Sequence, residues 1–278
     1  MAKEKEPKYC PSLLNNDMIN YNVYYMSVWE KMIYFLFTFV AGGLVGQVFY
    51  GGLFKEEGMA TTATLISNVC VFCIVGGIAA KIFMPAIRNS LKEKRAKKLE
   101  KQFIDMLESI SSSLASGNTV NDAFINAKTD LLNQYTEDEL IIKELKEINE
   151  GLINGRTLEE LLNDFGRRSN NEDVQNFSNV ISNCYRLGGN FNTVVRRTRD
   201  IICDKIAITE EINTKVASNR LQLNVMCLMP IALVAMLKST SPSFAENLSS
   251  FLGVFVTTVA VGVFVGAYFW GQKIIDIR

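Results

Sequence analysis

Histidine is absent from the 278 residues, and proline is scarce at five. Without histidine the chain cannot form Ser-His or Cys-His catalytic pairs, imidazole zinc ligands or a histidine pH switch. A net charge is absent too, because 29 basic residues balance 29 acidic ones. A balanced chain is a poor candidate for binding nucleic acid through a basic surface, so no nucleic-acid partner is expected.

Nucleotide-binding motifs are also missing. The sequence has no Gly-x-x-x-x-Gly-Lys-Ser/Thr loop and no Gly-x-Gly-x-x-Gly turn after a strand. Cys70-x-x-Cys73 has thioredoxin-like spacing, but it lies in an apolar run with no basic neighbour to stabilise a thiolate. A pair of packing cysteines is the favoured interpretation. We therefore predict a protein that is not an enzyme, with no catalytic residue, cofactor or metal site.

Long apolar runs are what the chain has instead. Hydrophobic residues make up 48% of it beside 21% charged residues, which suggests that part lies in lipid and part in water. Helices of about 20 residues cross the roughly 30 Å of hydrocarbon in a bilayer. A buried core helix is the alternative for any one run. The predicted transmembrane helices are residues 32–54, 62–84, 221–238 and 251–271, after an N-terminal segment of residues 1–31.

Basic residues indicate the orientation of these spans. Eight lysines and arginines lie between Lys81 and Lys101, whereas the connections 55–61 and 238–250 hold one lysine each. Positive charge gathers on the cytoplasmic side of a membrane, so the long middle segment and both termini are expected in the cytoplasm. The prediction is a multi-pass protein of the inner (cytoplasmic) membrane. The basic run is interpreted as a topology signal, with lipid contact as a second role.

The middle segment, residues 88–220, has helical periodicity throughout and no alternation typical of a strand. Its first helix has an apolar face made of Leu99, Phe103, Met106, Leu107, Ile110 and Leu114. Short turns separate six such helices, which is enough for a small helical core. The predicted fold is all-α, with one six-helix domain between two pairs of transmembrane helices.

Capping residues and glycines delimit these helices. A side-chain oxygen at a helix start accepts a hydrogen bond from a free backbone amide, and glycine adopts the left-handed conformation that ends a helix. The predicted caps are Thr119, the boxes Thr136-x-x-Glu139 and Thr157-x-x-Glu160, and Asn171. The predicted turn glycines are Gly117, Gly155, Gly188 and Gly189. No proline lies between Leu91 and Pro230, so the sixth helix is expected to continue into the third span.

Small residues inside the spans offer weaker signals. Gly42-x-x-x-Gly46 and Gly262-x-x-x-Gly266 could let helices approach closely. No ionisable residue lies deep in a span, and Lys238 is expected to extend its ammonium to an interface. Transporters usually need buried charge in the membrane, which makes a transporter or channel the weaker alternative.

The order of these features resembles a known family. The segment QFIDMLESISSSLASGNTVNDAF (102–124) is similar to the opening of the cytoplasmic domain in F-family proteins of the type II secretion system. The segment 154–197 resembles the rest of that domain, and the similarity extends over about residues 99–237. Its family-like positions are Gly155, Leu158, Leu162, Gly188, Gly189, Asn190, Phe191 and Val194. One copy of the domain with two spans on each side is similar to the tight-adherence (Tad/Flp pilus) platform proteins B and C.

The resemblance implies an inner-membrane platform for a type IV pilus or type II secretion machine. In that family a cytoplasmic assembly ATPase drives the platform, which lifts pilin subunits out of the bilayer into a fibre. The implied partners are therefore this ATPase, pilin subunits, the lipid bilayer, and a sister F-family protein or further copies of the chain. An F-domain scaffold of a sporulation-type channel is the closest alternative function.

Two arginine clusters are candidate contacts with the motor or another partner, and a solvated helix face is the alternative for both. They comprise Arg167 with Arg168, and Arg196, Arg197 and Arg199.

Overall fold

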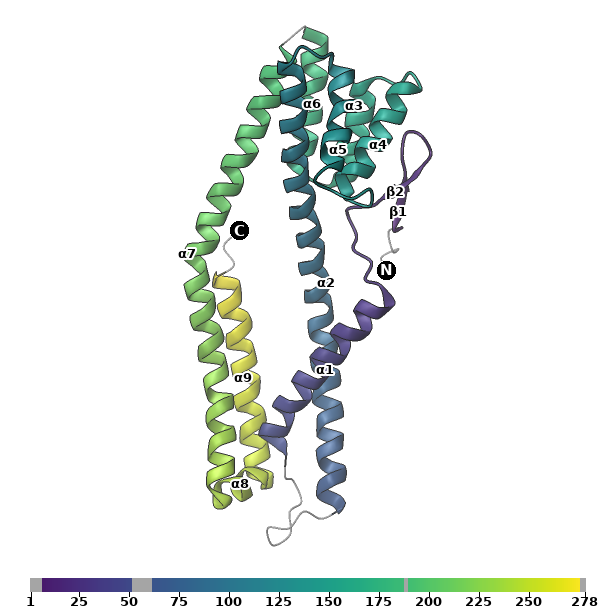
Figure 1. Ribbon diagram of the computed structural model, residues 1–278. Coiled ribbons are helices and arrows are strands. Elements are labelled where there is room, and N and C mark those ends of the chain that lie inside the picture. Colours follow the sequence, from purple (N-terminus) through teal and green to yellow (C-terminus); the bar gives the residue numbers. More distant parts are fainter. Residues whose placement is uncertain (1–6, 52–61, 188–189, 276–278) are drawn as a thin grey trace. The chain divides into compact units, whose positions relative to one another are not determined.

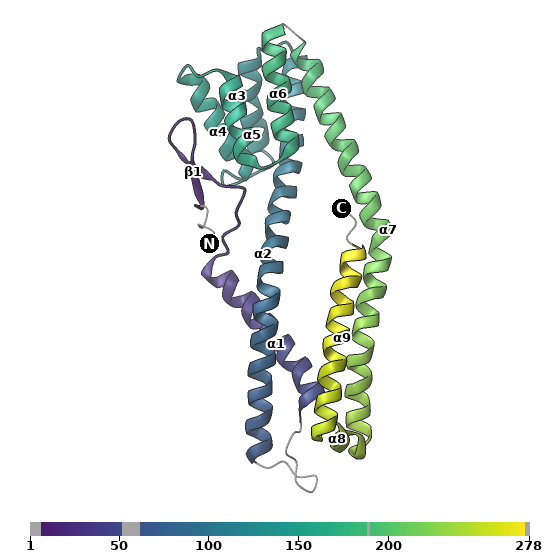
Figure 2. The same cartoon turned by 180° about the vertical axis from the view of Figure 1, so that it is seen from behind.

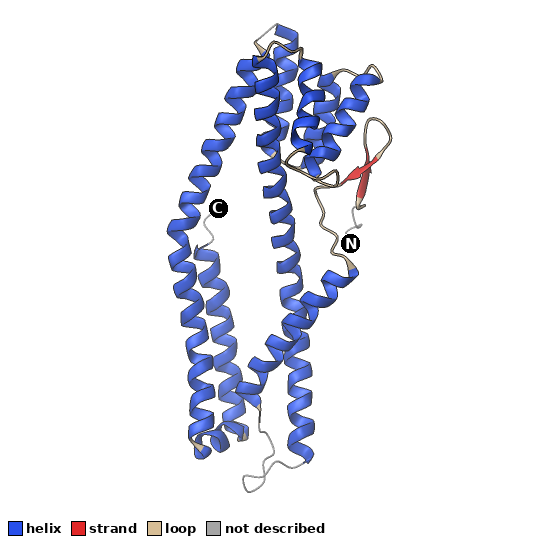
Figure 3. Cartoon of the chain, in the orientation of Figure 1, coloured by secondary structure: helices blue, strands red, loops and turns tan. Residues whose placement is uncertain are grey.

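The computed structural model describes residues 7–51, 62–187 and 190–275, and nearly all of them are helical (Figure 3). The elements are β1 (Tyr9–Pro11), β2 (Asp17–Ile19), α1 (Val28–Tyr50), α2 (Thr62–Ala115), α3 (Val120–Leu132), α4 (Leu140–Ile153), α5 (Leu158–Ser169), α6 (Glu172–Leu187), α7 (Phe191–Thr240), α8 (Pro242–Ser249) and α9 (Phe251–Ile275). The all-α prediction therefore needs one correction, because a two-stranded hairpin lies near the N-terminus.

The chain divides into two compact units. We call Met1–Tyr25 with Arg88–Thr209 the helical unit, and Met26–Ile87 with Glu210–Arg278 the apolar unit. Two long helices, α2 and α7, contribute residues to both units.

The core of the helical unit consists of apolar faces at helical spacing. Leu99, Phe103, Met106, Leu107 and Ile110 are all buried on α2, which confirms the face predicted from periodicity. Helices α3 to α6 pack successively on one another, and Figure 1 shows them beside this part of α2. Burying one large apolar side chain stabilises the fold by about 1.5–3 kcal/mol, so this face is a major source of stability.

Aromatic rings occupy the centre of this core. The ring of Phe103 meets Phe165 of α5 and Phe177 of α6 edge to face, with centroids 6.2 Å and 5.5 Å apart. Edge-to-face pairs add stabilisation beyond the area that they bury, because the positive ring edge meets the negative ring face. The three rings thereby link α2, α5 and α6.

Three of the four predicted helix caps are confirmed. Thr119 accepts a hydrogen bond from the amide of Asp122, and Thr157 accepts one from Glu160. Asn171 accepts two at the start of α6, from the amides of Asp173 and Val174. The fourth prediction, a cap at Thr136, is wrong.

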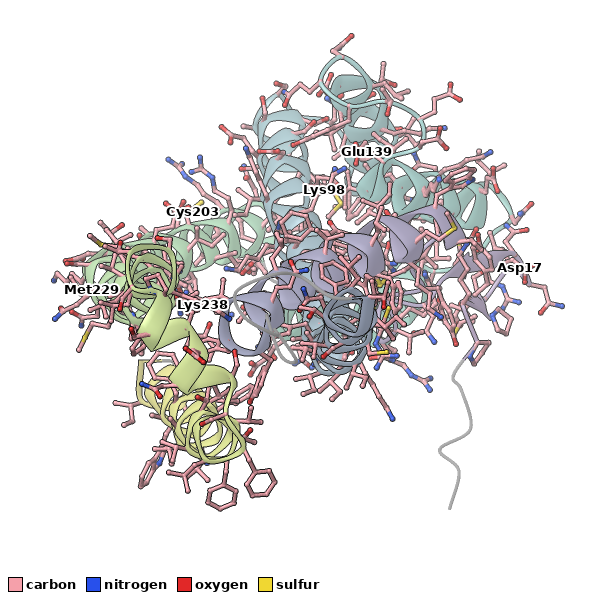
Figure 4. The ribbon with its side chains drawn as sticks, turned by 90° about the horizontal axis from the view of Figure 1, so that it is seen from below. Asp17, Lys98, Glu139, Cys203, Met229 and Lys238 are labelled. Carbon is pink, nitrogen blue, oxygen red and sulfur yellow. The ribbon has the colours of Figure 1, made fainter. Side chains whose placement is uncertain are left out.

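Helix α4 begins later than the Thr136 box predicts. Its cap is Glu139, whose carboxylate accepts hydrogen bonds from Lys98 (2.9 Å) and Gln102 (2.8 Å) on α2 instead of closing a box with Thr136. Figure 4 shows Lys98 and Glu139 side by side. The tertiary ion pair therefore outcompetes the local capping motif.

The N-terminal hairpin pairs β1 with β2 in antiparallel register, Tyr9 opposite Ile19 and Pro11 opposite Asp17. Asn15 lies in the intervening turn with φ +64°, a conformation that asparagine tolerates better than most residues. Figures 1 and 2 both show the hairpin beside α4 and α5. Sequence patterns predict no helix or strand within residues 1–31, so only the structure reveals this docked hairpin.

The apolar unit has a different composition. Within the described residues, four helices are long and apolar enough to cross a membrane, namely Val28–Tyr50, Thr64–Ala115, Phe191–Thr240 and Phe251–Gly271. Each includes most of one apolar run, and Thr64–Ala115 and Phe191–Thr240 extend far beyond theirs. Helix α7 passes Pro230 without a break, which confirms that the sixth helix continues along the third apolar run. Helix α2 likewise passes Pro85, a continuity that the sequence did not predict.

Glycines hold α1 against α2 in this unit. A Cβ added to Gly42 would lie 2.5 Å from the Cβ of Ala79, and one added to Gly46 would lie 2.8 Å from that of Val75. Because glycine has a hydrogen atom in place of a side chain, α1 and α2 can approach closely at these positions. At the corresponding pair on α9, Gly262 and Gly266, no atom of the described residues lies within 4 Å of such a Cβ, so close packing is not seen there.

Side-chain hydrogen bonds join α1 to α7 and α9 in the apolar unit. Lys238 donates hydrogen bonds to the carbonyls of Val48 (3.1 Å) and Gly51 at the end of α1. A cation at a helix C-terminus complements the partial negative charge of the last carbonyls. Lys238 therefore caps the C-terminal end of α1. Tyr50 donates a further hydrogen bond, to the hydroxyl of Thr258 on α9 at 3.0 Å.

Candidate functional site

The strongest concentration of buried polar groups lies where the N-terminal segment meets α4 and α5. We use "N-terminal segment" for residues 7–25. Two carboxylates of α4, Glu144 and Glu147, accept its hydrogen bonds: Tyr21 donates to Glu144 at 2.9 Å, and Ser12 and Asn16 donate to Glu147, the latter at 2.9 Å. Both carboxylates are buried, Glu144 completely.

The buried charge of Glu144 is matched by Arg168 of α5. The guanidinium donates two parallel hydrogen bonds to the carboxylate, at 3.0 Å and 2.8 Å, and a third to Asp164 at 2.7 Å. A planar guanidinium fits a carboxylate in this bidentate manner, which gives the pair direction as well as energy. Leaving either charge buried alone would be strongly unfavourable.

Burial and ion pairing shift the pKa values of Glu144 and Arg168 in opposite directions. Burial raises the pKa of the Glu144 carboxyl above its ordinary value, against the attraction of Arg168. For Arg168, burial disfavours the charged form, but Glu144 and Asp164 outweigh it and raise its pKa. The pKa of the Tyr21 phenol is raised by burial and by the neighbouring Glu144. The phenol and the guanidinium thus remain hydrogen-bond donors, as the carboxylate requires.

The far end of the N-terminal segment is held by α2. Arg95 lies over the ring of Tyr24, 4.6 Å from its centroid, and donates to the carbonyl of Val23 at 3.5 Å. Two residues further on, Met26 and Ser27 lead directly into α1. The docked segment therefore connects α1, along the chain, to the face formed by α4 and α5.

A polar cavity of about 410 Å³ lies between the segment and α5. Its wall combines segment residues with the last turns of α5, including Cys10, Asn20, Asn22, Asp164 and Arg167. The carboxylate of Asp164 is already engaged by Arg168. No group of three or more histidine, cysteine, aspartate or glutamate side chains suited to a metal ion occurs in residues 7–51, 62–187 and 190–275.

The first arginine cluster divides between surface and interior. Arg167 is exposed at the rim of the cavity, whereas Arg168 is 9% exposed and fully engaged by two carboxylates. Arg168 is thereby removed from the set of candidate partner contacts, because its guanidinium already holds the fold together.

The second arginine cluster lies on α7. Arg196 and Arg197 are exposed, and Arg199 is half-buried beside Glu108 of α2 (3.4 Å) and Asp200 (3.1 Å). No contact in the described part of the chain brings this cluster to Arg167.

Of the four turn glycines, two are described. Gly117 has φ +88° and Gly155 has φ +77°, values that favour glycine because they are strained for other residues. Gly188 and Gly189 lie outside the described residues.

Sequence reasoning missed the carboxylates of α4 and their partners. In the run Leu-Ile-Ile-Lys-Glu-Leu-Lys-Glu, Glu144 and Glu147 read as ordinary polar positions. The available signal was three-residue spacing, which places both glutamates on one helix face next to Leu145 and Ile148.

Comparison with known proteins gives one finding. The family model described as Type II secretion system (T2SS), protein F, matches residues 106–237. No curated protein and no solved structure matches the chain. The matched stretch begins in α2, includes α3 to α6 and extends along most of α7. The match supports assignment of these residues to the F family. In general terms, it also supports a role as a structural membrane platform related to type II secretion and type IV pili.

Proposed function

Since residues 106–237 carry a type II secretion system protein F domain, we propose that the protein is an inner-membrane platform subunit of a Tad/Flp-like type IV pilus or a type II secretion machine. It couples a cytoplasmic assembly ATPase to the extraction of pilin from the bilayer and to fibre assembly. Its role is mechanical rather than catalytic. The helical unit and both termini are cytoplasmic, and the four apolar helices span the membrane.

One observation carries this proposal beyond the family match. Helix α7 runs for 50 residues from the matched domain through the third apolar run, a rise of about 75 Å. A helix is stiff because each turn is hydrogen-bonded to the next, whereas a loop dissipates displacement. Work received by the cytoplasmic helices would thus reach the membrane through α7.

A flexible insertion in α7 tests the coupling. Seven Gly/Ser residues after Ser218 should abolish surface fibres while the protein still accumulates and folds. The matched control inserts seven helix-forming residues, which add about two turns and nearly restore the helical phase. Fibres are measured by electron microscopy and by immunoblotting of the sheared surface fraction. Normal assembly with the Gly/Ser insert would contradict the proposal.

The exposed arginines of α7 are the proposed contact with a partner. Reversing the charge with Arg196→Glu and Arg197→Glu should weaken co-purification of the assembly ATPase with the full-length protein in detergent. Lys146→Glu, a single charge reversal at an exposed position on α4, serves as the control for charge reversal elsewhere on the helical unit. Equal recovery of the ATPase with all variants would remove these arginines from the interface.

Co-purified proteins also distinguish the possible machines. An ATPase with a second four-span F-family protein would support the Tad/Flp assignment. Recovery of components of a sporulation channel would favour the scaffold instead.

A further inference from the structure

The N-terminal segment contributes little to the apolar core on which it lies. Tyr21 is its one member of the buried apolar cluster among the described residues, and Ile19 packs against the edge of that cluster. The large rings at the centre, Phe103, Phe165 and Phe177, all come from helices. The core of the helical unit would therefore persist if the segment left.

The buried ion pair beneath the segment would stay intact after release. Glu144 retains both hydrogen bonds from Arg168, and Arg168 retains Asp164. Release breaks the hydrogen bonds from Tyr21, Ser12 and Asn16 and the contacts of Arg95 with the Tyr24 ring and the Val23 carbonyl, and Glu147 would gain water in exchange. A buried charge left alone would oppose release, but this face leaves none.

The segment itself cannot hold its shape away from the helices. Its strands are three residues long, and a two-stranded hairpin of this size is marginal in water. Docking therefore orders the segment, and departure disorders it. The ordering cost makes the docked state only modestly favoured, as is typical of regions that open below the global unfolding free energy.

From these contacts we propose that residues 7–25 form a releasable strap, which docks through Tyr21 and the carboxylates of Glu144 and Glu147 and detaches without unfolding the helical unit. When docked, the strap connects α1 to the α4–α5 face through Met26 and Ser27 alone. On release, α1 retains its covalent link to the helical unit through α2 only. The strap is thus a conformational device that engages or frees one of the two chain connections between α1 and the helical unit.

Hydrogen exchange on the full-length protein in detergent tests release. The amides of Ser12 and Asn20 are hydrogen-bonded inside the strap, to Asn16 and Lys8. They should exchange at least about tenfold faster than the amides of α4 and α5, and with little dependence on denaturant. Equal rates and equal denaturant dependence for strap and helices would overturn the proposal.

Two substitutions sharpen the measurement. Tyr21→Ala should speed strap exchange by about tenfold or more and leave α5 and α6 within about twofold of wild type. Tyr21→Phe keeps the ring in the core and removes only the hydrogen bond to Glu144, so a smaller, few-fold increase is expected even if Tyr21→Ala folds poorly. Asp17→Ala, at an exposed position of the hairpin labelled in Figure 4, is the control and should change neither rate. Parallel acceleration of strap and helices in Tyr21→Phe would show that the strap does not release independently.

Discussion

Phe103 of the helical unit and Phe37 of the apolar unit lie in opposite surroundings. Phe103 is completely buried among rings, whereas Phe37 of α1 is 73% exposed. The helical unit excludes water by filling its interior, and it pairs the charges that it buries. The apolar unit turns its large side chains outward and brings α1 and α2 together over glycines. In a chain that spans a membrane, an apolar residue therefore indicates contact with a hydrophobic medium, and the medium can be protein or lipid.

The largest effect expected from this contrast is the removal of a buried ring. Phe103→Ala should lower the free energy of unfolding by about 3–5 kcal/mol, because it leaves a cavity and removes two edge-to-face contacts. Phe37→Ala is the matched control in the apolar unit and should cost less than about 1 kcal/mol. Circular dichroism at 222 nm during thermal unfolding in detergent compares the two. Equal losses of unfolding free energy in the two variants would contradict the difference between the units.

The next largest effect concerns buried charge. Arg168→Ala should destabilise the helical unit by about 3 kcal/mol, because Glu144 would remain buried without its cation. The neighbouring, exposed Arg167→Ala should stay within about 0.5 kcal/mol of wild type. The double variant Arg168→Leu with Glu144→Leu should recover part of the loss, since neither charge then remains. No recovery in a denaturant titration would mean that the hydrogen bonds, rather than charge compensation, set the stability.

A smaller effect is expected where backbones approach in the apolar unit. A Cβ on Gly76 would lie 2.6 Å from the carbonyl oxygen of Phe39, so Gly76→Ala should cost about 1–3 kcal/mol. The next residue, Gly77, has no such neighbour within 4 Å in the part of the chain that the structure describes, and Gly77→Ala should be neutral or stabilising by up to about 1 kcal/mol. Melting temperatures in one detergent report the difference. Similar values for both would show that α1 and α2 need no close contact.

The smallest effect belongs to the surface of the helical unit. Hydrogen bonds from Lys98 and Gln102 lower the pKa of Glu139 from its ordinary 4.5, although partial burial opposes them. The stabilisation is therefore complete above pH 4.5 and is lost as the pH falls through the lowered pKa. Glu139→Gln should cost less than about 1 kcal/mol at pH 7 and approach wild type in acid, as followed by unfolding at several pH values. A constant difference down to acid pH would assign the effect to the helix cap rather than to the ion pair.

Local patterns predicted most of the helices. The spacing of Leu99, Phe103 and Ile110 is set within one helix, and so are the caps at Thr119 and Thr157, which explains why sequence alone located them. The cap predicted at Thr136 does not form, because Lys98, which is distant in the sequence, binds Glu139 and stabilises it as the cap instead. The expected domain boundaries and membrane orientation stay predictions.

The docked segment could not be predicted in the same way. Its strands are too short to show alternation, and its stability depends on carboxylates that lie more than 120 positions away along the chain. The sequence makes Arg168 a candidate contact because it shows the charge of a side chain but not its burial. Only the tertiary structure separates it from Arg167.

The ties between the N-terminal segment and α4 also constrain how this protein can diverge. Tyr21, Glu144 and Arg168 satisfy one another, so a change at one of these positions favours a compensating change at the other two. A homologue that lacks the hairpin would have Glu147 in water and would be free to replace it. Aligned homologues should therefore show correlated substitution between the first twenty-five residues and the middle of α4.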